Sequence, residues 1–95
     1  MHPVRESDVE NYLIREVHRL GGAIRKVKWI GRRGAPDRRV MLPWGCTWVE
    51  LKRPGEVLQP HQKREHKRMR KYGEVVVTLD SFNAIDRWLA AGIAA

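Results

Sequence analysis

Apolar residues recur at helical intervals near the start of the chain. They are Val9, Leu13, Val17 and Leu20. A spacing of three or four places them on one face of a helix, which we expect to pack on a core. Ser7 and Glu10 have the spacing of a capping box, and Gly21-Gly22 ends the pattern. The pattern therefore predicts a helix over residues 8–20.

Three strand-like runs follow this helix. Residues 23–30 are rich in β-branched and aromatic side chains interleaved with basic ones, which is typical of a strand with one wet face. After a loop over 31–36, residues 37–42 and 47–52 form two further runs. The connection between them, 43–46, has the length of a hairpin turn, so we expect the two strands to pair antiparallel.

The second half of the chain predicts two helices and one strand. Residues 60–72 form a basic helix, with a proline in its first turn and a glycine at its end. Residues 74–79 are strongly β-branched, and a last helix follows from a capping residue at position 80 or 81. The order of elements is therefore αβββαβα, in one α/β domain over residues 1–95.

Length and charge limit the classes of function. The chain has 95 residues, enough for a single core. Its one cysteine, Cys46, excludes a disulfide framework, and we expect it to be a small core residue. We see no signal peptide or membrane span, so we expect a soluble intracellular protein. A net charge of +8 favours a polyanionic partner, with nucleic acid ahead of a membrane surface.

The hairpin carries the candidate chemistry. If it closes symmetrically through 43–46, Asp37 at the start of one strand comes near Glu50 and Lys52 at the end of the other. Glu50 and Lys52 are two residues apart, so they project from the same face of their strand. Two acids and one lysine thus gather at one sheet edge, although Glu50 and Lys52 alone would favour an exposed salt bridge.

Phosphodiester hydrolysis needs residues of this kind. Carboxylates can hold Mg²⁺ or Mn²⁺ against a scissile phosphate, where the metal stabilises the developing charge. Asp37 and Glu50 are the candidate ligands. Lys52 can orient or deprotonate the attacking water, or neutralise charge on the phosphate, and the sequence leaves these roles open.

Together, the motifs around these residues resemble those of a known family over nearly the whole chain. The motifs are Gly34-Ala35-Pro36-Asp37, then Val49-Glu50-Leu51-Lys52 with Pro54-Gly55, then Gln62, and Gly73 before Val75-Val76-Val77. This set resembles the VRR-NUC (virus-type replication-repair nuclease) domains of the PD-(D/E)xK superfamily. The resemblance implies a restriction-endonuclease-like fold, with a mixed sheet flanked by helices.

The resemblance also implies a set of site residues. Asp37, Glu50 and the backbone carbonyl of Leu51 would bind the metal, with Lys52 near the attacking water. Gln62 would support the site, although it could also be an ordinary surface residue of its helix. A helix-1 acid is implied too, and Glu10 is the better candidate, although the capping box would explain it without catalysis.

The activity implied by the resemblance is that of a metal-dependent DNA endonuclease. It would select branched, flap or Holliday-junction DNA in replication, repair or recombination, act as a homodimer, and work in the cytoplasm of a bacterium or phage-infected host. The alternative is a non-catalytic basic nucleic-acid-binding module that retains the fold. A small RNA-associated protein would explain the charge but leaves the acidic pair unexplained.

Basic residues surround the predicted site. Those expected to contact DNA phosphates are Arg32, Arg33, Arg38 and Lys63. For the helix cluster that includes Lys63, a merely solvated face is the alternative. The histidines show no metal-ligand spacing, so we expect His18, His61 and His66 on the surface.

Overall fold

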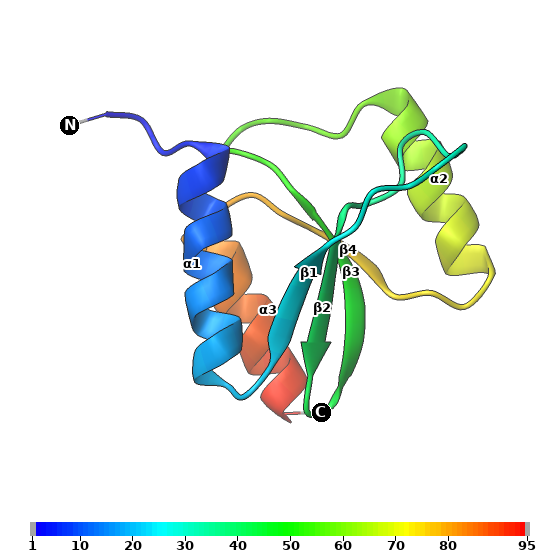
Figure 1. The fold of residues 1–95 in the computed structure, drawn as a ribbon. Helices are drawn as coiled ribbons and strands as arrows, with labels where there is room; N and C mark the ends of the chain where they lie inside the picture. The colour runs from blue at the N-terminus through cyan, green and yellow to red at the C-terminus, as the bar shows by residue number, and fades with distance from the viewer. Residues whose placement is uncertain (1, 95) are drawn as a thin grey trace.

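The computed structural model describes residues 2–94. Its elements follow the predicted order αβββαβα (Figure 1). They are α1 (Glu6–Arg19), β1 (Ala23–Lys26), β2 (Arg38–Leu42), β3 (Gly45–Leu51), α2 (Pro60–Lys71), β4 (Val76–Leu79) and α3 (Phe82–Ala94). Within residues 2–94, no helix is long and apolar enough to cross a membrane.

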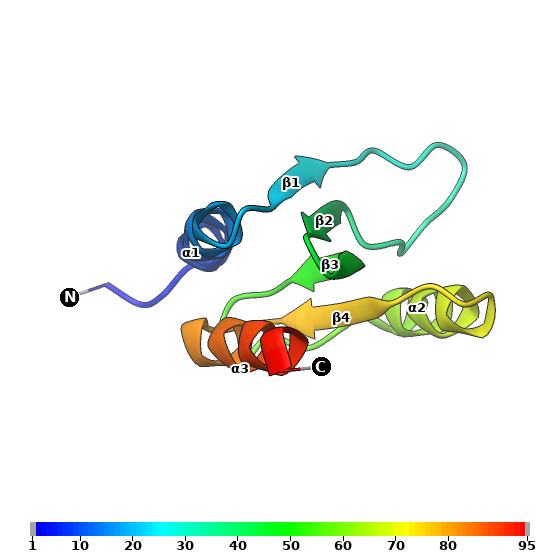
Figure 2. The same cartoon turned by 90° about the horizontal axis from the view of Figure 1, so that it is seen from below.

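One mixed sheet organises the domain. Its strands lie in the order β1-β2-β3-β4, with antiparallel pairing up to β3 and a parallel pair of β3 and β4. The crossover between the parallel strands contains α2, as parallel pairing requires a long connection. Helices α1 and α3 lie together beside the sheet, and α2 lies away from them near β4 (Figure 2). The predicted mixed sheet flanked by helices is confirmed.

The core lies between the sheet and the pair α1 and α3. It contains Val9, Leu13 and Val17 of α1, Val40, Val49, Leu51 and Leu79 of the sheet, and Ile85 and Leu89 of α3. Alternate residues of β2 and β3 face this core, as the period of a strand requires. Each large aliphatic side chain buried here contributes about 1.5 to 3 kcal/mol of hydrophobic stabilisation.

The hairpin turn is tighter than predicted. Leu42 pairs with Gly45, so only Pro43 and Trp44 connect the strands. Two-residue connections match the twist of paired strands, and Gly45, with φ of 150°, adopts a backbone that other residues avoid. Cys46 is therefore on the strand next to the turn, and it is exposed rather than in the core.

The bounds of α1, β1 and β4 also differ from the prediction, and β4 begins at Val76 rather than at residue 74. Helix α1 begins at Glu6, and the backbone N–H of Arg5 donates to the Asp8 carboxylate at 2.8 Å. The capping pair thus lies two residues earlier than expected and does not involve Glu10. Strand β1 ends at Lys26 rather than at residue 30, because the chain leaves the sheet after the Val27 N–H donates to the Asp37 carbonyl.

Candidate active site

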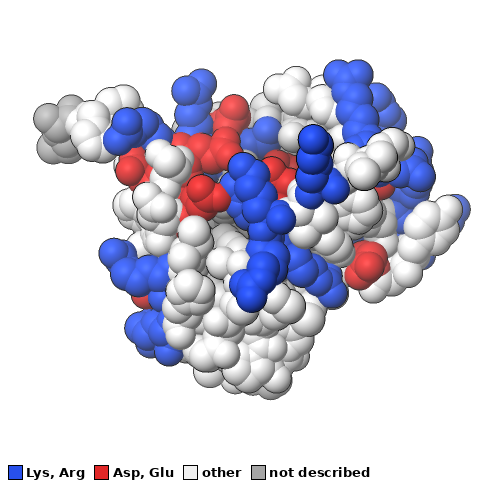
Figure 3. All heavy atoms as spheres, in the orientation of Figure 1, with Lys and Arg blue, Asp and Glu red and all other residues white. Residues whose placement is uncertain are grey.

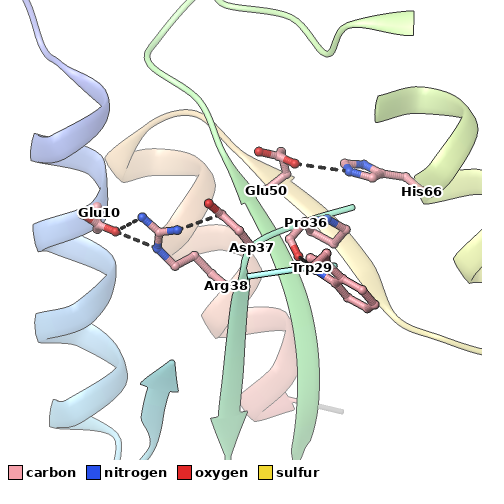
Figure 4. Close-up of polar contacts among 7 residues, drawn as sticks. All are labelled: Glu10, Trp29, Pro36, Asp37, Arg38, Glu50 and His66. Carbon is pink, nitrogen blue, oxygen red and sulfur yellow. Dashed lines mark hydrogen bonds and ion pairs between the residues drawn. The ribbon is translucent and has the colours of Figure 1, made fainter. Parts of the chain in front are cut away.

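The start of β2 and the end of β3 bring two acidic side chains together. Arg38 lies opposite Val49 in the strand register. One step further out, the same register places Asp37 opposite Glu50, at one end of the sheet (Figure 4). The tight turn shifts the register by two residues from a symmetric closure over 43–46, so that Glu50 rather than Lys52 faces Asp37.

The Glu50 carboxylate lies in a place that disfavours its charge. Its side chain is only 12% exposed. Burial, followed by the negative charge of Asp37, raises the pKa of Glu50 to about 7, although Lys52 and Arg38 oppose the shift. Two neighbouring carboxylates whose charges repel each other are the arrangement that a bound cation would relieve.

Lys52 follows β3 directly and is nearly buried. Its backbone N–H donates to the Leu79 carbonyl at 3.0 Å, which continues the pairing with β4. The side chain is 7% exposed, and its charge works to lower the pKa of Glu50 and of His66. The ammonium group therefore belongs to the same electrostatic neighbourhood as the acidic pair.

Arg38 joins helix α1 to this site. Strand alternation turns its side chain to the core face, where it is 8% exposed. Its Nε lies 2.6 Å from Glu10 Oε2, and its Nη1 lies 2.7 Å from Asp37 Oδ1 (Figure 4). Burial works to lower the pKa of Arg38, but these two acids outweigh it and raise the pKa. The structure thus places Arg38 between two carboxylates rather than on the surface predicted to contact phosphate.

Comparison with known proteins bears on this geometry. No family model matches the chain. It is 46% identical over 82 residues to "Putative nuclease p44" of Acyrthosiphon pisum secondary endosymbiont phage 1, covering 85% of this chain and 88% of that protein. A solved structure titled "VRR_NUC domain" superposes with a TM-score of 0.83 at 39% identity, covering 92% of this chain and 96% of the other.

The chain belongs to the VRR-NUC family. Both matches cover most of this chain and most of the related protein, so the family assignment extends over the whole fold. The resemblance drawn from the sequence motifs is thereby confirmed.

Glu10 contacts the candidate site through Arg38. Because Asp8 provides the helix cap, capping does not account for Glu10. Its carboxylate binds the Arg38 guanidinium, which in turn binds Asp37. Glu10 therefore helps to hold Asp37 in place, and its role as a metal ligand stays a prediction.

Gln62 has a structural task at the start of α2. Its Oε1 accepts a hydrogen bond from the Gln59 backbone N–H at 2.9 Å, which satisfies a donor that the helix leaves free. The amide N–H₂ of Gln62 is not used by this contact. Its support of the metal site stays a prediction.

The position of His66 differs from the sequence prediction. We expected a surface histidine, but His66 is fully buried. Its Nε2 lies 3.4 Å from Glu50 Oε1 (Figure 4). The spacing of His66 from Gln62 and Met69 is the signal that could have located it, because residues four and three apart share the face of α2 that turns to the sheet.

The residues present suit a hard cation, although the set is small. Within residues 2–94, no three side chains of His, Cys, Asp or Glu gather as a ready-made metal site. Asp37 and Glu50 offer oxygen donors, whereas Glu10 is committed to Arg38. Two carboxylates fit Mg²⁺, which usually keeps several waters and takes further oxygens from a phosphate substrate.

Basic side chains flank the acidic site. Figure 3 shows acidic residues gathered on one part of the surface, with Lys and Arg around them. A groove of about 500 Å³ runs beside Asp37 and is lined by Lys26, Lys28, Trp29 and Arg32. Arg32 is one of the predicted phosphate contacts, whereas Lys26 and Lys28 are not, because the sequence pattern places both lysines on the wet face of a longer strand.

The loop before Asp37 is fixed at several points. Trp29 Nε1–H donates to the Pro36 carbonyl at 2.8 Å. Arg32 lies 3.9 Å from the buried Glu65 of α2, which also pairs with Arg68 at 2.7 Å. Arg33 and Lys63 are both exposed, and Arg33 lines a hollow together with Arg64 and Arg68 of α2. The loop can therefore present its basic residues from a defined position.

We expect Arg33→Ala to weaken DNA binding by a similar factor for all DNA sequences. Removal of one phosphate contact should lower the slope of log K against log salt by roughly one. Arg87→Ala, which removes an exposed arginine on α3, serves as the matched control. Binding titrations at several salt concentrations measure both slopes, and equal slopes in the two variants would remove Arg33 from the interface.

The raised pKa of Glu50 predicts a pH-dependent stability in metal-free protein. The unfolded chain loses this proton near pH 4.5 but the folded chain only near pH 7, so folding becomes less favourable as the pH rises between these values. Glu50→Gln should remove this pH-dependent decrease in stability. The variant should gain roughly 2 to 3 kcal/mol in free energy of unfolding over the wild type across that range. Urea denaturation in EDTA at pH 4.5 and 8 measures the difference, and a pH-independent difference would contradict the assignment.

Proposed function

We propose that the protein is a Mg²⁺- or Mn²⁺-dependent DNA endonuclease that prefers branched DNA. The observation that carries this proposal is the meeting of Asp37 and Glu50 at one end of the sheet, with Lys52 beside them. The family relationship supports hydrolysis of a nucleic acid, since the phage relative is named as a nuclease.

The residues would share the work of phosphodiester cleavage. Asp37, Glu50 and the Leu51 carbonyl would hold the divalent cation. When bound, that cation polarises the scissile phosphate and stabilises the negative charge that develops on it. Lys52, buried beside Glu50, would donate a hydrogen bond to the attacking water or to a phosphate oxygen. Either contact would align the water with the scissile phosphate.

Arg38 and Glu10 would position the metal-binding groups without binding the metal themselves. The Arg38 guanidinium fixes the Asp37 carboxylate through their ion pair, and Glu10 fixes the guanidinium from α1. A ligand held by buried partners loses less conformational entropy when it binds the cation.

The rival function is a basic module that binds nucleic acid without cutting it. In such a module, Asp37 and Glu50 would repel the ligand from the middle of its basic surroundings unless a cation bridged them. In metal-free protein, burial and the charge of Asp37 make the ionisation of Glu50 unfavourable. A protein that only binds phosphate has no use for a carboxylate in such an environment. These considerations favour the nuclease.

Branched DNA and a homodimer are the finer parts of the proposal. One small site cuts one strand, so treatment of both strands at a junction calls for two copies related by a two-fold axis. The exposed Trp44 at the hairpin tip is a candidate for the contact between subunits. A role in replication, repair or recombination would follow from a preference for branched substrates.

A substrate panel tests this function. The purified protein is incubated with Mg²⁺ or Mn²⁺ and end-labelled junction, flap, duplex and single-stranded DNA, and its mass is measured by light scattering. We expect cleavage of the junction or flap at least about tenfold faster than of the duplex, by a dimer. Equal rates on all substrates would reject the preference for branches, and a monomer that cuts both strands would reject the dimer.

A further inference from the structure

The His66 ring is buried without a partner of good geometry. It is 0% exposed, between α2 and the sheet. Among the described residues, neither ring nitrogen makes a hydrogen bond of good geometry, although the Gly34 backbone lies close enough to favour the charged ring. A buried polar group in this condition costs about 1 to 3 kcal/mol, which an apolar side chain of similar size would avoid. A histidine at this position, where an apolar residue would fit, therefore calls for a partner that accepts from or donates to the ring.

The ring faces the Glu50 carboxylate. His66 Nε2 lies 3.4 Å from Glu50 Oε1, slightly beyond the usual range of an N–H···O hydrogen bond (Figure 4). The two groups come from different elements, α2 and β3, so the contact links the helix to the candidate metal site. The N–H would have to turn toward the carboxylate, as well as move closer to it, to complete the bond.

We propose that His66 is a positioning residue that donates its Nε2–H to Glu50 Oε1 and leaves Oε2 free to bind the divalent cation. This inference rests on the proposed function, because it assigns Glu50 as a metal ligand. In carboxylates that bind metals, a hydrogen bond to one oxygen fixes the direction of the other, and removal of such a partner typically weakens metal binding about 10- to 100-fold.

The surroundings of the ring agree with a neutral donor. Burial, followed by the charge of Arg70, lowers the pKa of His66, although the Gly34 backbone and Glu65 act in the opposite direction. A neutral imidazole carries one N–H, which can be directed at the carboxylate.

Mn²⁺ binding, measured by calorimetry in the absence of DNA, tests the proposal. His66→Leu keeps the volume and removes the donor, whereas His66→Gln keeps an N–H. We expect His66→Leu to bind Mn²⁺ at least about tenfold more weakly than the wild type, and His66→Gln to recover most of that loss. His18→Leu, at an exposed position of α1, should bind like the wild type.

Each outcome is decisive. Wild-type affinity in a folded His66→Leu variant would overturn the proposal, as would equal losses in His66→Leu and His66→Gln. Failure of the wild type itself to bind Mn²⁺ would overturn the metal-dependent function and this inference with it. If His66→Leu does not fold, the imidazole ¹H–¹⁵N spectrum of the Mg²⁺-loaded wild type decides, since the proposal requires the proton on Nε2 and a proton on Nδ1 alone would reject it.

Discussion

Asp37→Ala is expected to lower the rate of DNA cleavage by at least about a hundredfold. The substitution removes one of the two carboxylates that would hold the cation, and loss of even an indirect partner of a metal ligand costs up to that factor. Arg38 would keep only Glu10 as an acidic partner. DNA binding should persist, because removal of a negative charge beside a basic groove reduces repulsion of phosphate.

The control for this prediction is Glu74→Ala. Glu74 is an exposed acid that precedes β4 and lies outside the candidate site. Its removal changes the net charge by the same amount, so single-turnover rates of the two variants separate a local effect from a general one. Comparable rates in Asp37→Ala and Glu74→Ala would show that Asp37 does not act in cleavage.

Gly34→Ala is expected to lower the free energy of unfolding by about 3 kcal/mol, from left-handed backbone strain and overpacking together. Gly34 has a φ of 86°, and a Cβ added there would lie 2.6 Å from the His61 carbonyl oxygen and 2.9 Å from its carbonyl carbon. These are backbone atoms in the first turn of α2, so the helix itself would have to move. Movement of α2 would also displace His66 from Glu50.

Gly31→Ala provides the matched control. Gly31 has a similar φ of 72° in the same loop, but nothing lies within 4 Å of an added Cβ. We expect this variant to lose only about 1 kcal/mol, from backbone strain alone. Urea denaturation measures the free energy of unfolding of both variants. Equal decreases in the two would mean that the loop does not pack closely against α2. The comparison explains physically why a Gly-x-Pro-Asp motif begins with glycine.

Local patterns were sufficient to predict the elements of this fold. The apolar spacing of α1, with Val9, Leu13 and Val17, reflects one buried face, and the structure buries all three. The hairpin predicted the approach of Asp37 to Glu50 because antiparallel strands joined by a short turn must align their outer ends. The sequence does not determine the exact register, because a turn of two residues and a turn of four residues give pairings that differ by two positions.

Features that depend on contacts between distant elements were not accessible from the sequence. The sequence predicts Arg38 as a phosphate contact, because its partner Glu10 lies 28 residues away on a helix whose rotation the sequence does not define. His66 is predicted on the surface because the histidines show no metal-ligand spacing, and this prediction overlooks the face of α2 that His66 shares with Gln62 and Met69. Both side chains are buried by the packing of helices on the sheet. Local pattern does not specify this burial for Arg38, whereas the helical spacing on α2 indicates it for His66.

The most direct test of the account is the cleavage of end-labelled junction DNA by the wild-type protein with Mg²⁺, with EDTA, and with Mg²⁺ restored. Lys52→Ala and Glu50→Gln variants that still bind the DNA are assayed beside it. The account predicts cleavage that requires the metal, returns with it, and is lost in both variants. Binding without cleavage under Mg²⁺ and Mn²⁺ alike, or cleavage that persists in EDTA, would contradict it.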